Sequence, residues 1–250
     1  MTIWEAKKEQ WNNIKSKSFK ERFSYFWEYF GIKVIALIAV AAVIVSLVIS
    51  LITKKDYALT CVFFGAQPTT SSSAFMDTFA QSANIDLSEY DLSVQCHLEI
   101  QMNQQVTQEI YTSMETFSAM VAAKSLDCFA GNVDLILYYA YLEYATDLRT
   151  VFSADEIALL KPYLHYIDGK LIENQESENA GVADAYVQRP DSTKPELMAD
   201  PIPVAISLEK ATDAFKESYH FGEDAVISIC ASAPYPEHAI TFLQYCLEIE

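Results

Sequence analysis

An uninterrupted apolar run from Val34 to Ile52 constrains this chain more than any other feature. Its sequence, VIALIAVAAVIVSLVISLI, contains no charged residue and only two serines. At about 1.5 Å rise per residue, a helix of this length covers the roughly 30 Å hydrocarbon core of a bilayer and satisfies its own backbone polar groups there. Because the run lacks the polar face of a buried soluble helix, we expect one transmembrane helix over residues 34–52.

The charged residues are distributed unevenly on the two sides of this run. Residues 1–53 contain seven basic and four acidic side chains, whereas residues 54–250 contain ten basic and thirty acidic ones. Seven basic residues precede the run, and only Lys54 and Lys55 closely follow it. The positive-inside rule therefore predicts a single-pass protein of the cell membrane, with a cytoplasmic N-terminus and an extracytoplasmic domain over residues 56–250. The acidic exterior lacks the basic surface that a nucleic-acid partner requires.

The arm before the run, residues 1–33, combines aromatic and basic residues. Trp4, Trp11, Phe23, Trp27 and Phe30 recur at helical spacing with lysines between them. Such an amphipathic helix lies in the headgroup region and anchors the chain, or docks a membrane partner through the same face.

The apolar run does not have the form of a cleaved signal. It is longer than a secretory h-region, it follows a long arm, and Lys54, Lys55 and Asp56 come directly after it. Cys61 lies beyond three charged residues and lacks a lipobox leucine at the required position. We therefore expect an uncleaved signal anchor.

The exterior alternates between strand-like and helix-like segments. Strands are predicted at 57–64, 92–100, 133–138, 203–208 and 225–231, and helices around 75–83, 104–124, 139–148, 153–164, 211–219 and from Pro236 onward. Ser153 is a predicted helix N-cap, and Pro236 occupies a first helical position. Residues 168–200 hold a turn and a polar, irregular excursion. The βαβα order predicts a three-layer α/β domain with a mainly parallel sheet.

The sequence favours neither a metal site nor a disulfide bond. The number of cysteines is odd, no two form a CxxC pair, and most of them lie in apolar runs, which favours buried free thiols. They are Cys61, Cys96, Cys128, Cys230 and Cys246. The four histidines are isolated from one another and from the cysteines, so no metal ligand set is expected.

The sequence contains none of the common catalytic or phosphate-binding motifs. It has no P-loop, no Rossmann glycine pattern, no GxSxG and no HExxH, and only six glycines. Asp127 and Asp134 flank a predicted turn and strand, where a solvated or capping role is favoured over acid–base chemistry. Asp134 is expected to open the strand 133–138 and to bond turn amides. We predict no catalytic residue and no cofactor, and thus a protein that is not an enzyme.

The densest aromatic cluster supplies the candidate ligand-binding residues. Tyr138, Tyr139 and Tyr141 follow the predicted strand 133–138, and the carboxyl ends of parallel strands are where open α/β sheets bind ligands. The alternative is that part of the cluster faces the helix core.

Several stretches resemble the bacterial extracellular solute-binding protein family of the periplasmic-binding type II. They are Tyr57–Phe64, Met120–Tyr138 (MVAAKSLDCFAGNVDLILY), Tyr141–Leu148, Tyr163–Lys170 and Val226–Leu247. The resemblance implies one lobe of that fold, because only residues 171–202 stand where a second lobe begins. It does not by itself imply a ligand cleft.

Two functions follow as expectations. The first is a membrane-anchored, non-catalytic binding or interaction module that docks a membrane protein complex or the envelope. The second is the solute-binding component of an ABC-type uptake system, with the three tyrosines at the edge of a small-molecule site.

Overall fold

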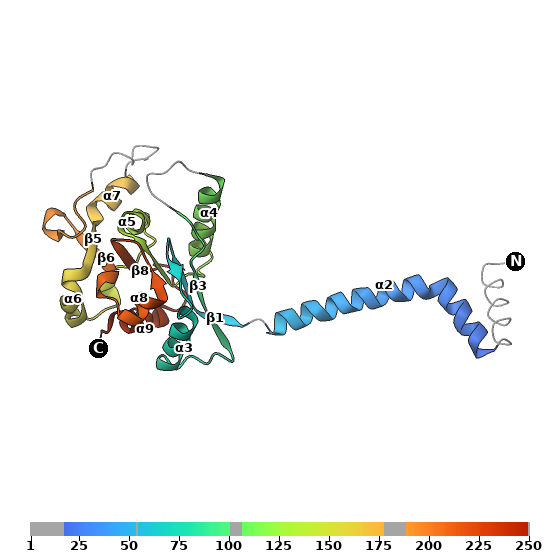
Figure 1. Ribbon diagram of the computed structural model, residues 1–250. Helices are drawn as coiled ribbons and strands as arrows, with labels where there is room; N and C mark the ends of the chain where they lie inside the picture. Colours follow the sequence, from blue (N-terminus) through green and yellow to red (C-terminus); the bar gives the residue numbers. More distant parts are fainter. Residues whose placement is uncertain (1–17, 54, 101–106, 178–188, 250) are drawn as a thin grey trace. The chain divides into compact units, whose positions relative to one another are not determined.

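The computed structural model describes residues 18–53, 55–100, 107–177 and 189–249. They form two compact units, one within residues 1–54 and one from Lys55 onward. Figure 1 shows a single long helix and an α/β domain.

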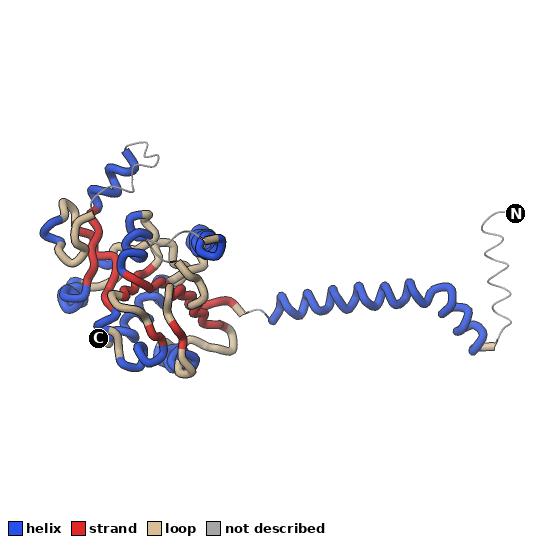
Figure 2. The backbone as a smooth tube through the Cα atoms, turned by 45° about the horizontal axis from the view of Figure 1, so that its top comes forward, coloured by secondary structure: helices blue, strands red, loops and turns tan. Residues whose placement is uncertain are grey.

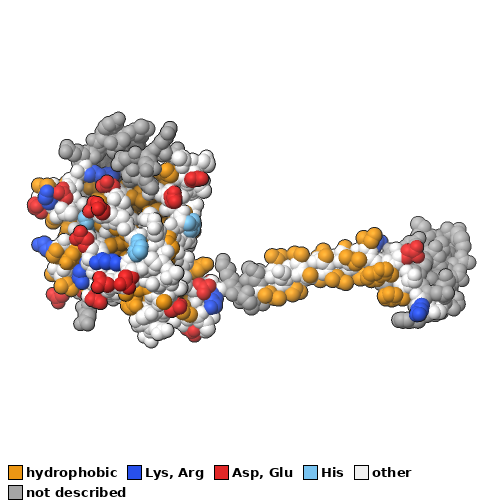
Figure 3. Space-filling view, in the orientation of Figure 1, with side chains coloured by type: hydrophobic (Ala, Val, Ile, Leu, Met, Phe, Trp, Pro, Cys, Tyr) orange, Lys and Arg blue, Asp and Glu red, His pale blue; other side chains and the backbone are white. Residues whose placement is uncertain are grey.

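The first unit is dominated by helix α2, Phe19–Thr53. Its stretch Gly31–Ile49 has a mean hydropathy of 3.0, and none of it is buried. Hydrophobic side chains line this stretch, and charged ones occur at the N-terminal end of the helix (Figure 3). Phe23 and Trp27 stack one turn apart, with ring centroids separated by 6.1 Å. The helix is therefore long and apolar enough to cross a membrane, and it extends well into the predicted arm.

The second unit is built on a mixed six-stranded sheet in the order β3-β1-β4-β8-β6-β5. The strands are β1 (Asp56–Phe63), β3 (Tyr90–Gln95), β4 (Cys128–Asn132), β5 (Leu164–Asp168), β6 (Pro201–Ser207) and β8 (Ala225–Ile229). Strand β1 pairs in parallel with both β3 and β4, whereas β8 is antiparallel to β4 and β6, and β5 is antiparallel to β6. The α/β class is thus confirmed, but the prediction of a mainly parallel sheet holds only for one half.

Helices cover both faces of the sheet (Figures 1 and 2). One face packs against α3 (Ser72–Ser82), α6 (Ala154–Leu160), α8 (Asp213–Ser218) and α9 (Pro236–Leu247), with Phe63, Phe79 and Phe242 fully buried between them. The other face packs against α4 (Gln108–Ala122), α5 (Val133–Tyr141) and α7 (Gly169–Ser177), around Phe117 and Phe129. The three-layer prediction is therefore confirmed.

Short elements complete the chain. They are the two-stranded sheet β2 (Gln67–Pro68) and β7 (Tyr219–His220), and the 3-10 turns η1 (Leu148–Thr150), η2 (Lys161–Tyr163), η4 (Pro195–Leu197) and η5 (Leu208–Lys210). The N-terminal signals predicted for two helices are confirmed. Ser153 and Glu156 form a reciprocal capping box on α6, and Pro236 opens α9.

The prediction for residues 133–138 was wrong. The strand is β4, Cys128–Asn132, and VDLILY begins helix α5. The Asn132 side chain accepts a hydrogen bond from the Asp134 amide at 3.0 Å, which caps the helix. The buried residues of α5 recur at helical spacing, and a short apolar run cannot by periodicity alone be assigned to strand or helix.

Three further predicted segments differ from the structure. The helix expected at 139–148 ends at Tyr141, and its remainder is a turn followed by η1. The strand expected at 92–100 ends at Gln95, although Leu98 and Ile100 are still buried. The excursion 168–200 contains helix α7 at its start. Part of the helix expected at 104–124 lies outside the described residues, and the described part is α4.

Candidate functional site

The candidate site lies between β1 and β4, at the point where the order in which successive strands are added to the sheet reverses. After β1 the chain crosses one face through α3 to β3, and it then returns across the other face through α4 to β4 on the opposite side of β1. The carboxyl ends of β1 and β4 therefore diverge into helices on opposite faces. Open α/β sheets form their binding crevices at such a point.

A hollow of about 620 Å³ lies at these strand ends. Its walls come from Phe64 and Gly65 after β1, from Asn132 and Asp134 at the β4–α5 junction, and from the loop 221–225 before β8. We call it the β1–β4 hollow. Gly131 is needed beside it, because a Cβ atom there would lie 2.9 Å from the Phe64 Cβ.

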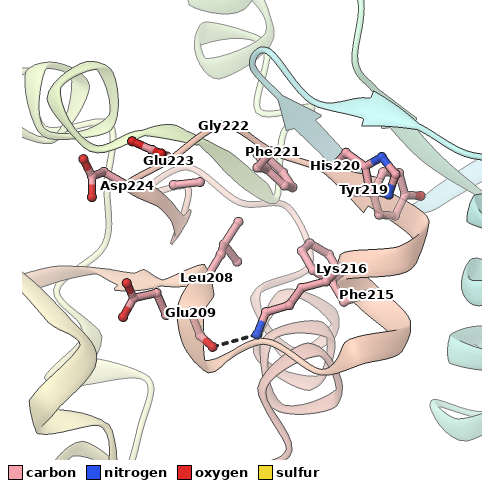
Figure 4. A pocket seen from close by; sticks show the side chains of 11 residues that line it. Leu208, Glu209, Phe215, Lys216, Tyr219, His220, Phe221, Gly222, Glu223 and Asp224 are labelled. Carbon is pink, nitrogen blue, oxygen red and sulfur yellow. Dashed lines mark hydrogen bonds between the residues drawn. The ribbon is translucent and has the colours of Figure 1, made fainter.

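A second hollow of about 560 Å³ adjoins it. We call it the β6–β8 hollow. Leu208, Phe215 and Tyr219 form its apolar floor, and loop 221–225 is again a wall. In Figure 4 the carboxylates of Glu209 and Asp224 lie at one end and Tyr219 and His220 at the other. The two hollows lie side by side and share loop 221–225 as a wall, and we call the pair the switch-point crevice.

The crevice is acidic. Asp134 lines the β1–β4 hollow, Glu209 the β6–β8 hollow, and Glu223 and Asp224 the shared wall. All four side chains are exposed, and none takes part in an ion pair among the described residues. Lys216 is the one lysine or arginine among the described lining residues, and its ammonium donates to the Glu209 backbone carbonyl at 2.8 Å (Figure 4). The crevice thus presents a negative potential to solvent.

The tyrosines predicted as ligand contacts do not line either hollow. Tyr139 is buried between Phe64, Phe117 and Tyr144, and burial raises the pKa of its hydroxyl. Its hydroxyl oxygen has no hydrogen-bond partner among the described residues. This position corresponds to the alternative in which the cluster faces the helix core.

Tyr138 and Tyr141 instead hold a side chain of the same protein. The Arg189 guanidinium lies 4.5 Å from the Tyr141 ring centroid and 5.9 Å from that of Tyr138. The Tyr141 hydroxyl accepts a hydrogen bond from the Asp168 amide at 3.2 Å. The pair thereby tethers Arg189, which lies within the excursion 168–200, to α5 by a cation–π contact.

One serine–histidine contact lies beside the open edge of β5. His165 Nδ1 and Ser192 Oγ are 2.9 Å apart. Burial lowers the pKa of His165, which favours the neutral imidazole, while Asp191, Asp224 and Glu209 act in the opposite direction. Asp191 itself pairs with Lys194 and bonds Thr193. The Tyr166 amide also donates to the Ser192 carbonyl, so the contact fastens this segment along the edge strand.

Two carboxylates that the sequence did not single out as cross-links, Asp127 and Asp168, are buried. Asp127 accepts hydrogen bonds from the Thr60 and Tyr235 amides, at 2.7 and 3.2 Å, and joins β4 to β1 and α9. Burial raises its pKa, against the effect of these two amides. A hollow of about 580 Å³ lies beside it, but both carboxylate oxygens are already satisfied. Burial excludes the solvated role expected for Asp127, whose carboxylate bonds backbone amides instead. Asp134 is exposed in the first turn of α5, so the expectation that it opens a strand was wrong.

No group of three or more His, Cys, Asp or Glu side chains in the described part of the chain could hold a metal ion. The five cysteines are free thiols, and four of them are buried. Burial raises the pKa of Cys61 and Cys128, which lie opposite each other on β1 and β4.

The chain matches no family model, no curated protein and no solved structure. The solute-binding resemblance therefore stays an expectation, and the geometry of the crevice carries the functional argument.

Proposed function

We propose that this protein is a single-pass membrane protein whose extracytoplasmic α/β domain binds a protein partner at the switch-point crevice without catalysing a reaction. The observation that carries the proposal is the open hollow at the carboxyl ends of β1 and β4, which is walled by segments distant in sequence and adjoined by a second hollow formed by residues 208–225. Its position follows the general rule for open α/β sheets.

The membrane part of the proposal rests on α2 and on the charges around it. A helix with a 19-residue window of mean hydropathy 3.0 is long enough to span a bilayer, and the excess of basic residues before it favours a cytoplasmic N-terminus. The aromatic and basic residues that open α2 suit the headgroup region.

Topology can be tested with a membrane-impermeant thiol reagent on intact cells. Four native cysteines are buried, so only the half-buried Cys96 needs replacement before Glu89→Cys is introduced on the exposed surface. We expect labelling without lysis. Labelling that requires lysis would reverse the proposed orientation.

The crevice can be tested with a photo-crosslinking amino acid in the full chain, in its own membranes. Gly222 is exposed, lines both hollows and has no heavy atom within 4 Å of an added Cβ, so a large side chain fits there without strain. We expect discrete adducts from position 222 and none from position 77, an exposed aspartate on α3. Equal crosslinking at both positions, or none at 222, would contradict the proposal.

The second candidate is a solute-binding component of an ABC-type transporter. The size of each hollow favours it, since ligand pockets commonly measure about 300–1,000 Å³. Against it, Gly169 to Asp200, between β5 and β6, is where a second lobe would have to be inserted, and its described part contains only α7 and η4. A small ligand that raises the melting temperature of the full chain would favour this candidate.

A further inference from the structure

The switch-point crevice combines an apolar floor with an acidic rim. Phe215, Tyr219 and Leu208 lie at the bottom of the β6–β8 hollow, and Phe221, which is half-buried, stands between the two hollows. The rim carries carboxylates and no free lysine among its described residues. An apolar side chain flanked by positive charges is the chemistry that such a surface complements.

The carboxylates extend along the whole depression and are not gathered in one hollow. Asp134 lies in the β1–β4 hollow, Glu209 in the β6–β8 hollow, and Glu223 and Asp224 in the wall between them. A small amine filling one hollow would leave the charges of the other without a partner. An extended chain with more than one basic residue would meet charges in both.

The exposure of these carboxylates also indicates the kind of interaction. Because all four are exposed, a cation can pair with them at little desolvation cost, as at the rim of a protein interface. A small solute, by contrast, is usually enclosed over most of its surface.

We propose that the crevice binds a basic segment of a partner protein, in which lysine or arginine residues alternate with an aromatic or aliphatic residue. The apolar side chain enters above Phe215 and Tyr219, and the cations pair with Glu209 and with Glu223 or Asp224 on the shared wall. This inference rests on the proposed function and adds the chemistry of the partner.

The test is fluorescence polarisation with the full chain in a neutral detergent. The probe is a labelled Lys-Phe-Lys-Phe-Lys peptide, and its comparator is Glu-Phe-Glu-Phe-Glu. We expect the basic peptide to bind at least about tenfold more tightly, and its affinity to fall at least about threefold between 50 and 300 mM salt.

Matched variants locate the binding. Glu209→Gln with Glu223→Gln should weaken the basic peptide about fivefold or more, whereas Glu89→Gln with Glu99→Gln, which removes the same charge from exposed positions elsewhere, should change it less than about twofold. Circular dichroism of each variant verifies that it is folded.

Several results would overturn the inference. Equal affinity for the acidic and basic peptides would do so, and so would equal losses in the crevice pair and the control pair. Competition by spermidine at a concentration similar to the peptide would assign the crevice to a small amine. If crosslinking at position 222 persisted in the Glu209→Gln, Glu223→Gln variant, the proposed function would stand and the basic segment would be rejected. The failure of this inference and the failure of the proposed function are therefore distinguishable.

Discussion

Asp168 provides the sharpest test of how the domain is held together. It is the last residue of β5, and its side chain is only 7% exposed. Its carboxylate accepts hydrogen bonds from the Lys170, Asp200 and Ala199 amides, at 3.1, 3.0 and 2.9 Å. It therefore joins the start of α7 to the segment that enters β6. The perturbation is Asp168→Ala, with Asp168→Asn as the isosteric variant.

The expected cost follows from the number of bonds lost. A hydrogen bond to a charged acceptor contributes about 1.5–3 kcal/mol, but amides on a partly exposed segment regain some of this from water. We therefore expect Asp168→Ala to lower the free energy of unfolding by about 2–4 kcal/mol, and Asp168→Asn by about 1–2 kcal/mol because one carbonyl acceptor remains.

The same carboxylate predicts a pH dependence. Burial by itself raises the pKa of Asp168, but the three amides and the nearby Lys170 lower it by more, so it lies below the ordinary value of 3.8. Because the folded-state pKa is the lower one, the carboxylate contributes stability above about pH 4, and this contribution is lost as the pH falls through the folded-state value. Asp168→Asn should remove this part of the acid sensitivity.

The assay is urea unfolding of residues 55–250, which form a compact unit of their own, between pH 7 and pH 3. Asp77→Ala, at an exposed position of α3, is the control and should change the free energy of unfolding by less than about 0.5 kcal/mol. If Asp168→Ala were as stable as the control, with an unchanged pH profile, the three hydrogen bonds to the Asp168 carboxylate would not contribute to the stability of the domain.

Four other substitutions can be measured in the same unfolding assay. Gly131→Ala should cost about 1–3 kcal/mol, because the new Cβ would lie 2.9 Å from that of Phe64; an unchanged midpoint would mean that β1 and β4 separate freely at their ends. Asn132→Ala should cost about 1 kcal/mol through loss of the α5 cap, while Asp134→Ala should stay within about 0.5 kcal/mol, and the reverse order would contradict the helix assignment. Tyr139→Phe should leave stability unchanged or raise it by up to about 1 kcal/mol, since it removes a buried hydroxyl without a partner; a clear loss would reveal an acceptor.

Much of the domain could be predicted because its signals are local. The first strand, the capping box at Ser153 and Glu156 and the proline that opens α9 are each defined within a few residues. The prediction placed a turn where β4 lies and a strand where α5 begins, because CFAGN contains a glycine that predicts a turn. There the glycine serves a close approach to Phe64, a partner distant in sequence.

The site could not be predicted for a related reason. The walls of the β1–β4 hollow come from residues after β1, from the β4–α5 junction and from the loop before β8, which lie far apart in the sequence. The β6–β8 hollow is lined by residues 208–225 alone, but nothing in that stretch predicts that it closes around a hollow. The tyrosines were singled out on the assumption that 133–138 is a strand. As part of α5, Tyr139 turns into the core and Tyr141 holds Arg189.

The acidic surface of the crevice is fixed by backbone geometry. Asp224 has a left-handed conformation, φ 54°, which aspartate tolerates better than most residues, and its carbonyl accepts the Val133 amide at 3.0 Å. This bond satisfies one of the free donors at the start of α5 and holds the shared wall against the helix that Asn132 caps. The side chains of Glu209, Glu223 and Asp224 are in no ion pair among the described residues, so a cation can bind them without displacing an existing partner. The backbone bond at Asp224 reduces the backbone entropy that the shared wall would lose on binding, which favours a basic partner at these carboxylates.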